Sequence, residues 1–375
     1  MKIGLVCPYS IAKGGGVQEI VYAMQVELNK RGHDAYIITP RPQDHELEPR
    51  DKMIFVGSAA DFNSPLHTTI QVSASVNDTI QNMLEEHQFD ILHFHEPWVP
   101  MLSMQILSRS TTVNVGTFHA KLPETMMSRT MAKVVTPYTK PILKYIDAFT
   151  APSDAAAEYL CSLTDAPVAI IPNAIDHRFT PPKVVKDNRK HKTILYVGRL
   201  EGRKGVNYLL HAFQKLSERR PDVSLVIAGD GADRNKLENL AADLELKNVE
   251  FRGYVTDDEK IKLLRDSDLF CAPAIYGESF GIVLIEAMAC GLVTVAGDNS
   301  GYKSVMKGLG AVSLVNPRHG DEFGRRLELL LYETDLRKLW REWAAAEIPQ
   351  YSYEHVVDQY VKVYKDAIAA KRREG

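Results

Sequence analysis

The chain has 375 residues, of which 45% are hydrophobic and 25% charged, and its formal net charge is −3. This balance is that of an ordinary globular protein and excludes disorder, fibres and disulfide scaffolds, while the length favours two domains over a single core. The charge provides no overall attraction to nucleic acid, so we expect no nucleic-acid partner.

Short β-rich runs alternate with helical patterns through the first half of the chain. The runs that indicate strands are 2–7, 35–39, 91–94, 113–117 and 148–151, and the helical patterns are 16–31, 76–88, 98–109 and 153–163. Such alternation predicts a parallel sheet with right-handed helical crossovers. Residues 1–172 are therefore predicted to form one Rossmann-like domain.

Prolines and charges interrupt this rhythm at 173–192, which we interpret as a linker. The rhythm then resumes with strand patterns at 193–197, 223–228, 249–251, 269–272 and 293–296, which predict a second α/β domain over 193–352. The last segment, 353–375, carries an amphipathic helix with Val356, Val357, Tyr360, Val361 and Tyr364 on one face.

Targeting and redox signals favour a cytoplasmic protein. The first apolar run, 3–7, is too short for a signal peptide, and the apolar stretch 281–297 contains Glu286 and turn glycines, which disfavours a spanning helix. The four cysteines show no C-x-x-C spacing, which is typical of reduced core residues and offers no zinc site.

A first glycine loop lies between the strand at 2–7 and the helix that follows. The backbone of Gly15 and Gly16 could approach an anion at the start of that helix. The loop does not match the dinucleotide motif, because Glu19 stands where a third glycine is needed. A plain loop-to-helix turn is the alternative.

A second loop, 198–205, follows a strand and opens a helix at the start of the second domain. Arg199 could bind a phosphate in bidentate fashion, and Lys204 adds a point charge. Two cations there would stabilise the negative charge that develops on a pyrophosphate leaving group. A solvated basic turn is the alternative.

The strongest pattern is 276–286. It combines a loop carboxylate, Glu278, with a predicted helix start at Ser279, Phe280 and Gly281, whose free N–H groups near 280–283 suit a phosphate. Glu286 lies in an otherwise apolar helix beside Ile282 and Val283. A buried carboxylate needs partners such as two ribose hydroxyls, whereas a surface-facing glutamate is the alternative.

Histidines mark the ends of two strands in the first domain. His119 ends one strand, where ligands gather in open α/β sheets, although a structural histidine is equally compatible with that position. We expect His93 and His95 to point to opposite faces of their strand, which argues against a shared metal. Asp266 and Asp268 imitate a D-x-D metal motif but precede a strand, so we expect no metal and no cofactor.

These motifs in combination resemble the family 4 retaining glycosyltransferases. The resemblance is carried by Gly15-Gly16 before Val17-Gln18, by 95–97, 117–119 and 171–173, by 198–205 and by 278–286. It implies the GT-B fold, in which two Rossmann-like domains face each other across a cleft and a C-terminal helix crosses back to the first domain. It also implies an enzyme that transfers a hexose from a nucleotide-sugar without a metal.

The resemblance further implies roles for individual residues. Arg199 and Lys204 would hold the donor phosphates and Glu286 the ribose, whereas His119 would contact the donor sugar. The sugar and phosphate would be bound by Glu278 together with Ser279, Phe280, Gly281, Ile282 and Val283, and Gly15 and Gly16 would also face the donor. Retention is explained in this family by front-face attack, so no paired carboxylates of the hydrolase kind are required.

Within the family, the likeness is greatest to enzymes that mannosylate phosphatidylinositol-type lipids. It implies GDP-mannose as donor and a lipid or glycolipid as acceptor, with Tyr9, Gln18 and Trp98 on the acceptor side. A UDP-sugar-dependent transferase acting on another acceptor is the alternative. A nucleotide-sugar-binding module without catalysis is a second one, and it predicts loss of His119 or of the two cations, all of which are present.

A basic stretch at 121–146 interleaves Arg129, Lys133, Lys140 and Lys144 with apolar residues. Such a composition suits an anionic membrane surface, and peripheral contact with the inner face of the cell membrane is one interpretation. Helices packed within the first domain are the other.

Overall fold

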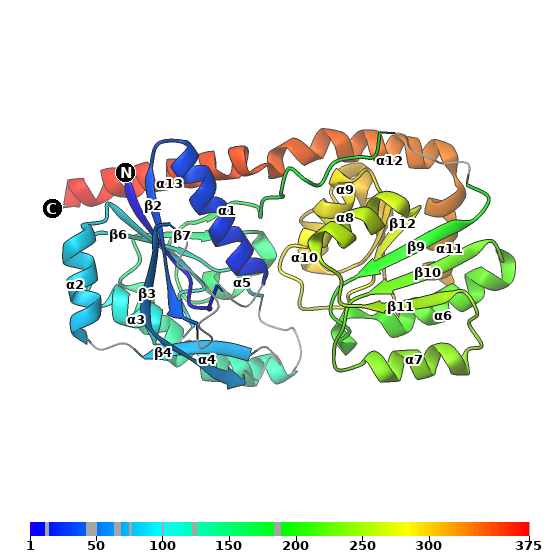
Figure 1. Cartoon of the computed structure of the whole chain (residues 1–375), viewed down its shortest axis with the longest axis horizontal. Coiled ribbons are helices and arrows are strands. Elements are labelled where there is room, and N and C mark those ends of the chain that lie inside the picture. Colours follow the sequence, from blue (N-terminus) through cyan, green and yellow to red (C-terminus); the bar gives the residue numbers. More distant parts are fainter. Residues whose placement is uncertain are drawn as a thin grey trace. The chain divides into compact units, whose positions relative to one another are not determined.

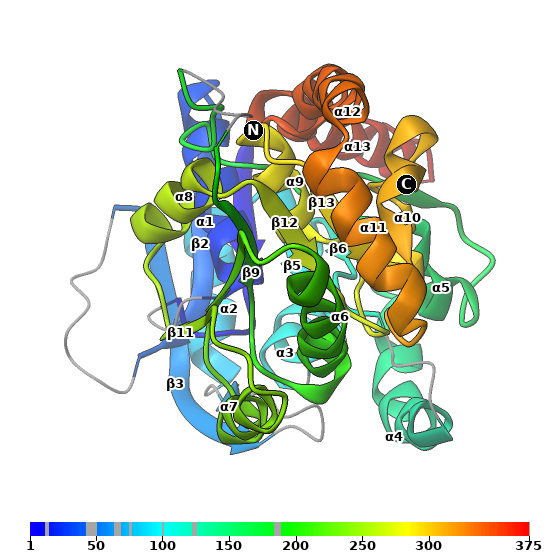
Figure 2. The ribbon, with the colours of Figure 1, turned by 90° about the vertical axis from the view of Figure 1, so that its right-hand side faces the viewer.

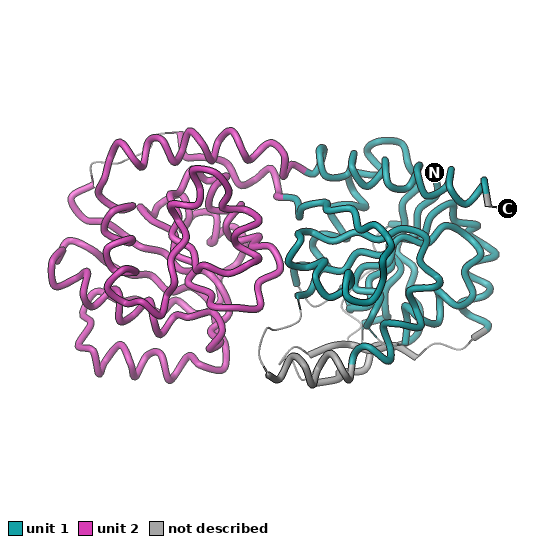
Figure 3. Tube along the Cα trace, turned by 180° about the vertical axis from the view of Figure 1, so that it is seen from behind, with its two compact units in different colours: residues 1–174, 353–375 teal, residues 175–352 magenta. Residues whose placement is uncertain are grey.

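The computed structural model describes residues 1–11, 15–42, 51–63, 69–74, 77–99, 101–121, 126–183 and 189–374, and within 58–77, 126–134 and at 374 only the backbone is described. The chain divides into two compact units (Figure 3). Unit 1 comprises Met1–Ala174 and Tyr353–Gly375, and unit 2 comprises Ile175–Ser352. The chain therefore leaves unit 1 once and returns to it at its end.

Within the described residues, unit 1 is built on an eight-stranded sheet of order β4-β3-β2-β1-β5-β6-β7-β8. Its strands are β1 (Lys2–Val6), β2 (Asp34–Arg41), β3 (Met53–Asn63), β4 (Thr69–Ala74), β5 (Ile91–His95), β6 (Val113–Thr117), β7 (Ala148–Ala151) and β8 (Val168–Ile170). Neighbours are parallel except for the antiparallel pair β3 and β4. Every residue of β5 and β6 is buried, as expected of strands covered on both faces.

Helices cover this sheet (Figure 1). They are α1 (Gly16–Lys30), α2 (Asn77–His87), α3 (Leu102–Leu107), α4 (Met126–Leu143) and α5 (Asp154–Cys161). In α1 the buried residues include Ile20, Met24 and Leu28, spaced four apart, so one stripe of the helix faces the sheet. Apolar residues of the central strands and of α3, such as Phe94 and Ile106, form the core beneath them.

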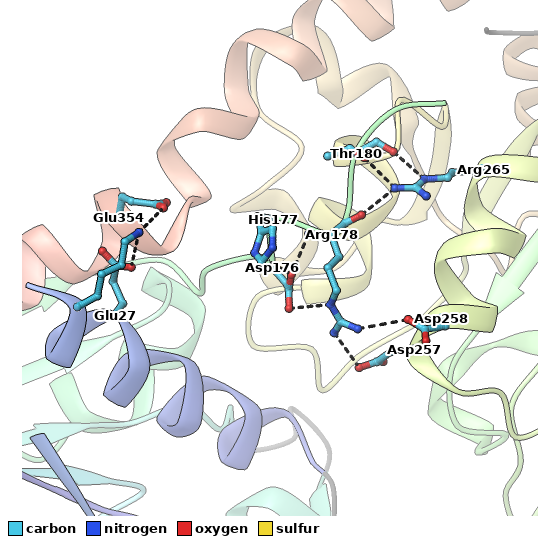
Figure 4. Close-up of polar contacts among 10 residues, drawn as sticks. Glu27, Asp176, His177, Arg178, Thr180, Asp257, Asp258, Arg265 and Glu354 are labelled. Atoms are coloured by element: carbon cyan, nitrogen blue, oxygen red, sulfur yellow. Dashed lines mark hydrogen bonds and ion pairs between the residues drawn. The ribbon is translucent and has the colours of Figure 1, made fainter. Parts of the chain in front are cut away.

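The last helix, α13 (Tyr353–Glu374), packs on α1 and β6 of unit 1 (Figure 1). Its buried face carries Val356, Val357, Tyr360 and Tyr364. On the polar side, Lys30 Nζ of α1 lies 3.7 Å from Glu354 Oε1 (Figure 4). The predicted return of the C-terminal helix to the first domain is confirmed.

Unit 2 contains, over its described residues, a six-stranded parallel sheet of order β11-β10-β9-β12-β13-β14. Its strands are β9 (Lys192–Val197), β10 (Val223–Ala228), β11 (Val249–Gly253), β12 (Leu269–Ala272), β13 (Thr294–Gly297) and β14 (Leu314–Val315). The covering helices include α6 (Val206–Arg219), α7 (Arg234–Asp243), α8 (Asp257–Asp266), α9 (Ile282–Ala289), α10 (Ser300–Lys303), α11 (Gly320–Tyr332) and α12 (Thr334–Glu347). Helices α6 and α11 lie side by side on the sheet (Figure 2).

Both sheets have a topological switch point, where the strand order reverses. It lies between β1 and β5 in unit 1 and between β9 and β12 in unit 2. Ligands of open α/β sheets bind at the carboxyl ends of the strands at such points. The loops after these four strands carry most of the residues that the sequence singled out.

The start of unit 2 is fastened to α8 by two arginines (Figure 4). Arg265 donates from Nη2 to the Arg178 carbonyl oxygen at 2.8 Å and from Nε to the Thr180 carbonyl oxygen at 3.0 Å. Arg178 lies 3.4 Å from Asp258 Oδ1.

A surface hollow beside these contacts is lined by His177, Arg178, Thr180, Asp258, Ile261, Lys262, Arg265 and Asp266. Residues 175–183, expected in a linker, thus belong to a compact unit.

The structure differs from the sequence-based elements in several places. Strands β3, β4, β8 and β14 were not predicted, because they are short or lack clear alternation. The helix expected at 98–109 is only α3 (Leu102–Leu107), and the helix expected to start at Ser279 begins at Ile282. The residue before it, Gly281, has φ 110, a left-handed conformation that stops the helix from extending backwards.

Candidate active site

In unit 2, the loop after β9 carries three cations. It continues through a short 3-10 turn, Gly202–Lys204, into α6. The Arg199 side chain is 49% exposed and lies 2.8 Å from Glu201 Oε1. Tyr196 donates a hydrogen bond to the Arg199 carbonyl oxygen at 2.8 Å, which fixes the start of the loop. The guanidinium is thus held near the switch point yet open to a ligand.

Gly205 allows this loop to approach the loop after β12. Its φ is 70, and a Cβ there would lie only 2.2 Å from the Pro273 carbonyl oxygen. A side chain at this position would force the two loops apart. Close approach of the loops brings Lys204 to the residues that follow β12.

Glu278 lies in the second loop and meets two cations of the first. Lys204 Nζ is 2.8 Å and Arg203 Nη1 is 2.7 Å from Glu278 Oε1. Arg203 also lies 3.0 Å from Glu201 Oε2, so it bridges the two carboxylates. The structure thus brings together Lys204 and Glu278, which the sequence assigned to phosphate and sugar. Arg203 was missed, although it stands directly before Lys204.

The charges of this cluster suit an anionic ligand. Arg199, Arg203 and Lys204 face the carboxylates of Glu201 and Glu278, which leaves one positive charge in excess. Burial is the largest single influence on the pKa of Arg203 and lowers it. The attractions of the guanidinium to Glu278 and Glu201 together outweigh burial, so the pKa is raised. A diphosphate would find cations already held in place by carboxylates.

The start of α9 lies next to this cluster. The helix runs from Ile282 to Ala289, and its first N–H groups have no partner within the helix. Phe280, which is 2% exposed, packs against the Tyr351 ring and anchors the preceding turn. The N–H groups of Ile282 and Val283 therefore belong to the first turn of α9, as an anion site at a helix start requires.

Glu286 lies in the second turn of α9 and is 7% exposed, so it is not a surface glutamate. Its partner in the structure is Lys260 of α8, whose Nζ lies 2.7 Å from Glu286 Oε1. Burial is the largest single influence on the pKa of Lys260 and lowers it. The attraction to Glu286 opposes this effect, and the pKa is raised overall. Lys260 was missed because nothing in the pattern of α8 distinguishes it from other surface lysines.

In unit 1, His119 follows β6 and is 7% exposed. Its Nε2 lies 2.9 Å from His95 Nδ1, and the two rings are stacked. Burial lowers the pKa of His119 to about 4, while Asn173 opposes the shift. The imidazole is therefore neutral near pH 7, and in this form it can donate a hydrogen bond to a sugar hydroxyl or accept one from it.

The expectation that His93 and His95 point to opposite faces is wrong. Residues two apart in a strand lie on the same face, and the two rings are 4.2 Å apart between centroids. His93 is hydrogen-bonded to Tyr364 of α13 at 2.7 Å and to Thr117 at 2.6 Å. Among the described residues, no group of three or more His, Cys, Asp or Glu could hold a metal.

The acceptor-side residues of the sequence prediction lie in the segments that follow β1 and β5 of unit 1. Tyr9 follows β1, and its carbonyl oxygen accepts a hydrogen bond from Thr39 at 2.9 Å. Gln18, in the first turn of α1, folds back over Gly15, because a Cβ on Gly15 would lie 2.6 Å from Gln18 Oε1. Gly16 is the first residue of α1. Trp98 follows β5, and its indole N–H donates to Glu96 Oε2.

Buried polar atoms without a protein partner gather at the same strand ends. In the described part of the chain, Ser10 Oγ, His95 Nε2 and His119 Nδ1 are among the few buried side-chain atoms that make no hydrogen bond. They follow or end β1, β5 and β6, which are neighbours in the sheet. Such atoms require a partner. All three atoms thus lie at the carboxyl-end edge of the unit 1 sheet, around its switch point.

Solved structures define the class of fold. The chain is similar to sucrose-phosphate synthase from Thermosynechococcus elongatus, with a TM-score of 0.76 and 20% identity over 98% of this chain and 99% of that one. It is also similar to an Anabaena protein solved with UDP and glucose, with a TM-score of 0.75 and 16% identity over 97% and 99% of the two chains. With its two α/β units and returning helix, the protein has the GT-B fold of glycosyltransferases.

The sequence places it in a family of that class. Residues 14–179 match Glycosyltransferase Family 4, and residues 178–346 match Glycosyl transferases group 1. The chain is 32% identical to the phosphatidyl-myo-inositol mannosyltransferase of Mycolicibacterium smegmatis over 99% of this chain and 95% of that protein. It belongs to the family 4 glycosyltransferases and is an enzyme that transfers a sugar.

Proposed function

We propose that the enzyme transfers mannose from GDP-mannose to a phosphatidylinositol-type lipid, with retention of configuration and without a metal. The observation that carries this proposal is the ion-paired cluster of Arg203, Lys204 and Glu278 at the switch point of unit 2. The cations of this cluster suit the diphosphate of a nucleotide-sugar, and its carboxylate suits the hydroxyls of the sugar next to the diphosphate. The 32% identity to a phosphatidyl-myo-inositol mannosyltransferase over nearly the whole chain supports mannose as the transferred sugar and a phosphatidylinositol-type lipid as acceptor.

On the donor side, the proposed roles follow the positions in unit 2. Arg199 and Lys204 bind the phosphates, and the first N–H groups of α9 bind the distal one. Glu286, whose carboxylate is held by Lys260, accepts hydrogen bonds from the ribose hydroxyls. Glu278 accepts hydrogen bonds from the sugar hydroxyls. Ser279, Phe280 and Gly281 shape the turn between sugar and phosphate.

For unit 1, the proposed roles are that His119 contacts the donor sugar and that Tyr9, Gln18 and Trp98 bind the acceptor head group. In the reaction, the bond between the anomeric carbon and the diphosphate oxygen breaks, and the acceptor oxygen bonds to the same face of that carbon. The acceptor proton passes to the departing diphosphate oxygen. The cations stabilise the charge that develops there, so a metal is not required for this step. A neutral His119 adds no positive charge near the electron-poor carbon.

A donor and acceptor screen tests the proposal. The protein is incubated with vesicles containing phosphatidylinositol and with GDP-mannose, UDP-glucose, UDP-galactose or UDP-N-acetylglucosamine, each with and without a chelator. We expect mannosylated lipid with the α configuration, formed equally in both conditions. Transfer from a UDP-sugar alone would replace the proposed donor, a β product would contradict retention, and loss of activity with the chelator would contradict metal independence.

We also propose peripheral contact with an anionic membrane surface, on the inner face of the cell membrane, through 121–146. The side chains of Arg129 and Lys133 lie outside the described residues. Tyr138 and Lys140 of α4 and Lys144 directly after it are exposed, whereas Ile142 is buried in the core. No helix in the described residues is long and apolar enough to span a membrane. Co-sedimentation with anionic but not neutral liposomes, weakened by salt, is expected, and its absence would contradict the contact.

A further inference from the structure

Glu96 is a buried carboxylate at the switch point of unit 1 that the proposed reaction does not use. It directly follows β5 and is 1% exposed. Its φ is 53, in the left-handed region that residues with side chains rarely adopt. The backbone is held there by a hydrogen bond from Glu96 N–H to the Thr117 carbonyl oxygen at 2.8 Å and one from Val99 N–H to the Glu96 carbonyl oxygen at 3.0 Å.

The side chain joins the loops after two neighbouring strands. Its carboxylate accepts hydrogen bonds from the Trp98 indole, in the loop after β5, and from the backbone N–H groups of His119 and Ala120, in the loop after β6. All of these partners are donors, and a carboxylate is the side chain that only accepts. One group therefore ties the tryptophan to the main chain of the histidine.

Holding a carboxylate in this place is unfavourable, because both burial and the left-handed backbone oppose it. Burial raises the pKa of Glu96 to about 7, while the hydrogen bonds from Trp98, Ala120 and His119 favour the ionised form. The titratable groups nearest to it include Tyr9, whose own pKa is raised by burial and by the Glu96 charge. Unfavourable geometry that neighbouring structure maintains is typical of functional sites.

We propose that Glu96 is a positioning residue, which fixes the Trp98 indole and the His119 main chain relative to each other by accepting hydrogen bonds from both. This proposal rests on the proposed function, because it assigns His119 to the sugar and Trp98 to the acceptor. The ring of His119 is held separately by His95. Loss of the carboxylate therefore leaves the imidazole hydrogen bond intact but releases the backbone that carries it.

Indole N–H resonances test the contact without any need for activity. The chain has three tryptophans, and Trp98→Phe identifies the signal of Trp98. We expect this signal to titrate with a midpoint near the pKa of Glu96, about 7, and to lose that titration and move upfield in Glu96→Gln. Trp340, which donates to Ser313 at 2.8 Å in unit 2, is an internal control and stays unchanged. A Trp98 signal that is the same in Glu96→Gln as in the wild type would overturn the proposal.

Steady-state kinetics test the positioning role. Glu96→Gln preserves the size of the side chain but places an amide against N–H donors, so kcat is expected to fall at least ~10-fold while GDP affinity in unit 2 stays within about twofold. Glu96→Asp should recover part of the loss, and Glu85→Gln on the exposed face of α2 should change nothing. A Glu96→Gln variant with wild-type kcat would overturn the role. If the indole signature appears but the wild type transfers no sugar to lipid, the proposed function fails and the contact stands.

Discussion

Lys204 Nζ and Glu278 Oε1 lie 2.8 Å apart, although the two residues come from loops that follow different strands of unit 2. The sequence assigned one of them to a phosphate and the other to a sugar. In the proposed function, this ion pair means that, before the donor binds, the carboxylate neutralises a cation assigned to the diphosphate. Binding of the donor must therefore redistribute hydrogen bonds within this cluster, and Arg203 can keep hold of Glu278 when Lys204 turns to the phosphate.

The ion pair between Lys204 and Glu278 determines whether GDP affinity rises or falls in the first prediction. Glu278→Gln should lower turnover by about 100-fold, because a sugar contact made in the transition state is lost. GDP affinity should stay equal or become tighter, since Lys204 and Arg203 lose a competing anion. Calorimetry with GDP and steady-state kinetics measure the two effects. A Glu250→Gln variant, changed in an exposed pair with Arg252 on β11, is the control. Weaker GDP binding in Glu278→Gln would contradict the assignment.

Lys204→Met and Arg199→Ala should have the opposite effect. Each removes a cation that we propose binds the phosphates, so GDP affinity should fall about 10-fold or more, consistent with the loss of one charge-assisted hydrogen bond. The loss should shrink as salt is added, because screening weakens the interaction in the wild type. Calorimetry with GDP at low and high salt measures this. Lys303→Met, which removes an exposed lysine paired with Asp298, is the matched control. Unchanged GDP affinity would mean that these two residues do not bind the phosphates.

His119→Ala tests whether a residue of unit 1 affects turnover without affecting nucleotide binding in unit 2. We expect kcat to fall about 100-fold, because the group proposed to contact the reacting sugar is lost. The proposed phosphate contacts lie in unit 2, so GDP affinity should not change. Replacing the exposed His355 of α13 by alanine provides the comparison. Equal losses in GDP affinity and in turnover would contradict a contact with the sugar.

Acid should destabilise unit 1 through its buried histidines. Burial lowers the pKa of His93 to about 3 and that of His119 to about 4, from an ordinary 6.5. Below pH 6.5 the unfolded chain binds protons that the folded chain does not, so stability falls as the pH drops towards these values. At pH 5 each histidine contributes at most about 2 kcal/mol to this loss. Glu96 acts in the opposite direction, because its raised pKa favours the folded state on acidification.

Denaturant unfolding at pH 7, 6 and 5 measures this dependence. His93→Gln should reduce the pH slope of stability by up to about 1.4 kcal/mol per pH unit, the value for one proton. His177→Gln is the control, because the His177 side chain is 96% exposed. Identical slopes in the wild type and in His93→Gln would show that His93 is not held neutral.

Gly301→Ala tests whether the position of Glu278 depends on close packing. A Cβ on Gly301, in α10, would lie 2.1 Å from the Glu278 carbonyl oxygen. The loop must move, which should cost about 1–3 kcal/mol of stability and lower kcat. Thermal unfolding and kinetics measure both. Gly320→Ala at the start of α11 is the control, since a Cβ there meets only Lys215 Nζ at 3.9 Å. A Gly301→Ala variant as active and stable as the control would contradict this packing argument.

Much of the fold and part of the site were predictable because they depend on local patterns. Alternating strands and helices predicted two α/β units, and the glycine and cation pattern of 198–205 predicted a loop between a strand and a helix. Strands β3 and β4 were missed, since β4 runs antiparallel to β3 at one edge of the sheet and this pair interrupts the alternation of strands and helices. Lys260 and Glu96 were missed as well, because no neighbouring residue in the sequence shows that they are buried.

The sequence by itself determined the two α/β units, the amphipathic C-terminal helix and the loops that carry Arg199, Lys204, Glu278 and His119, because hydrophobic periodicity and turn residues act over short distances along the chain. Only the tertiary structure decided which charges meet. Arg203 and Lys204 share Glu278, and Lys260 neutralises Glu286. The physical reason is that an ion pair depends on distance and burial, and both are set where strands remote in the sequence lie side by side.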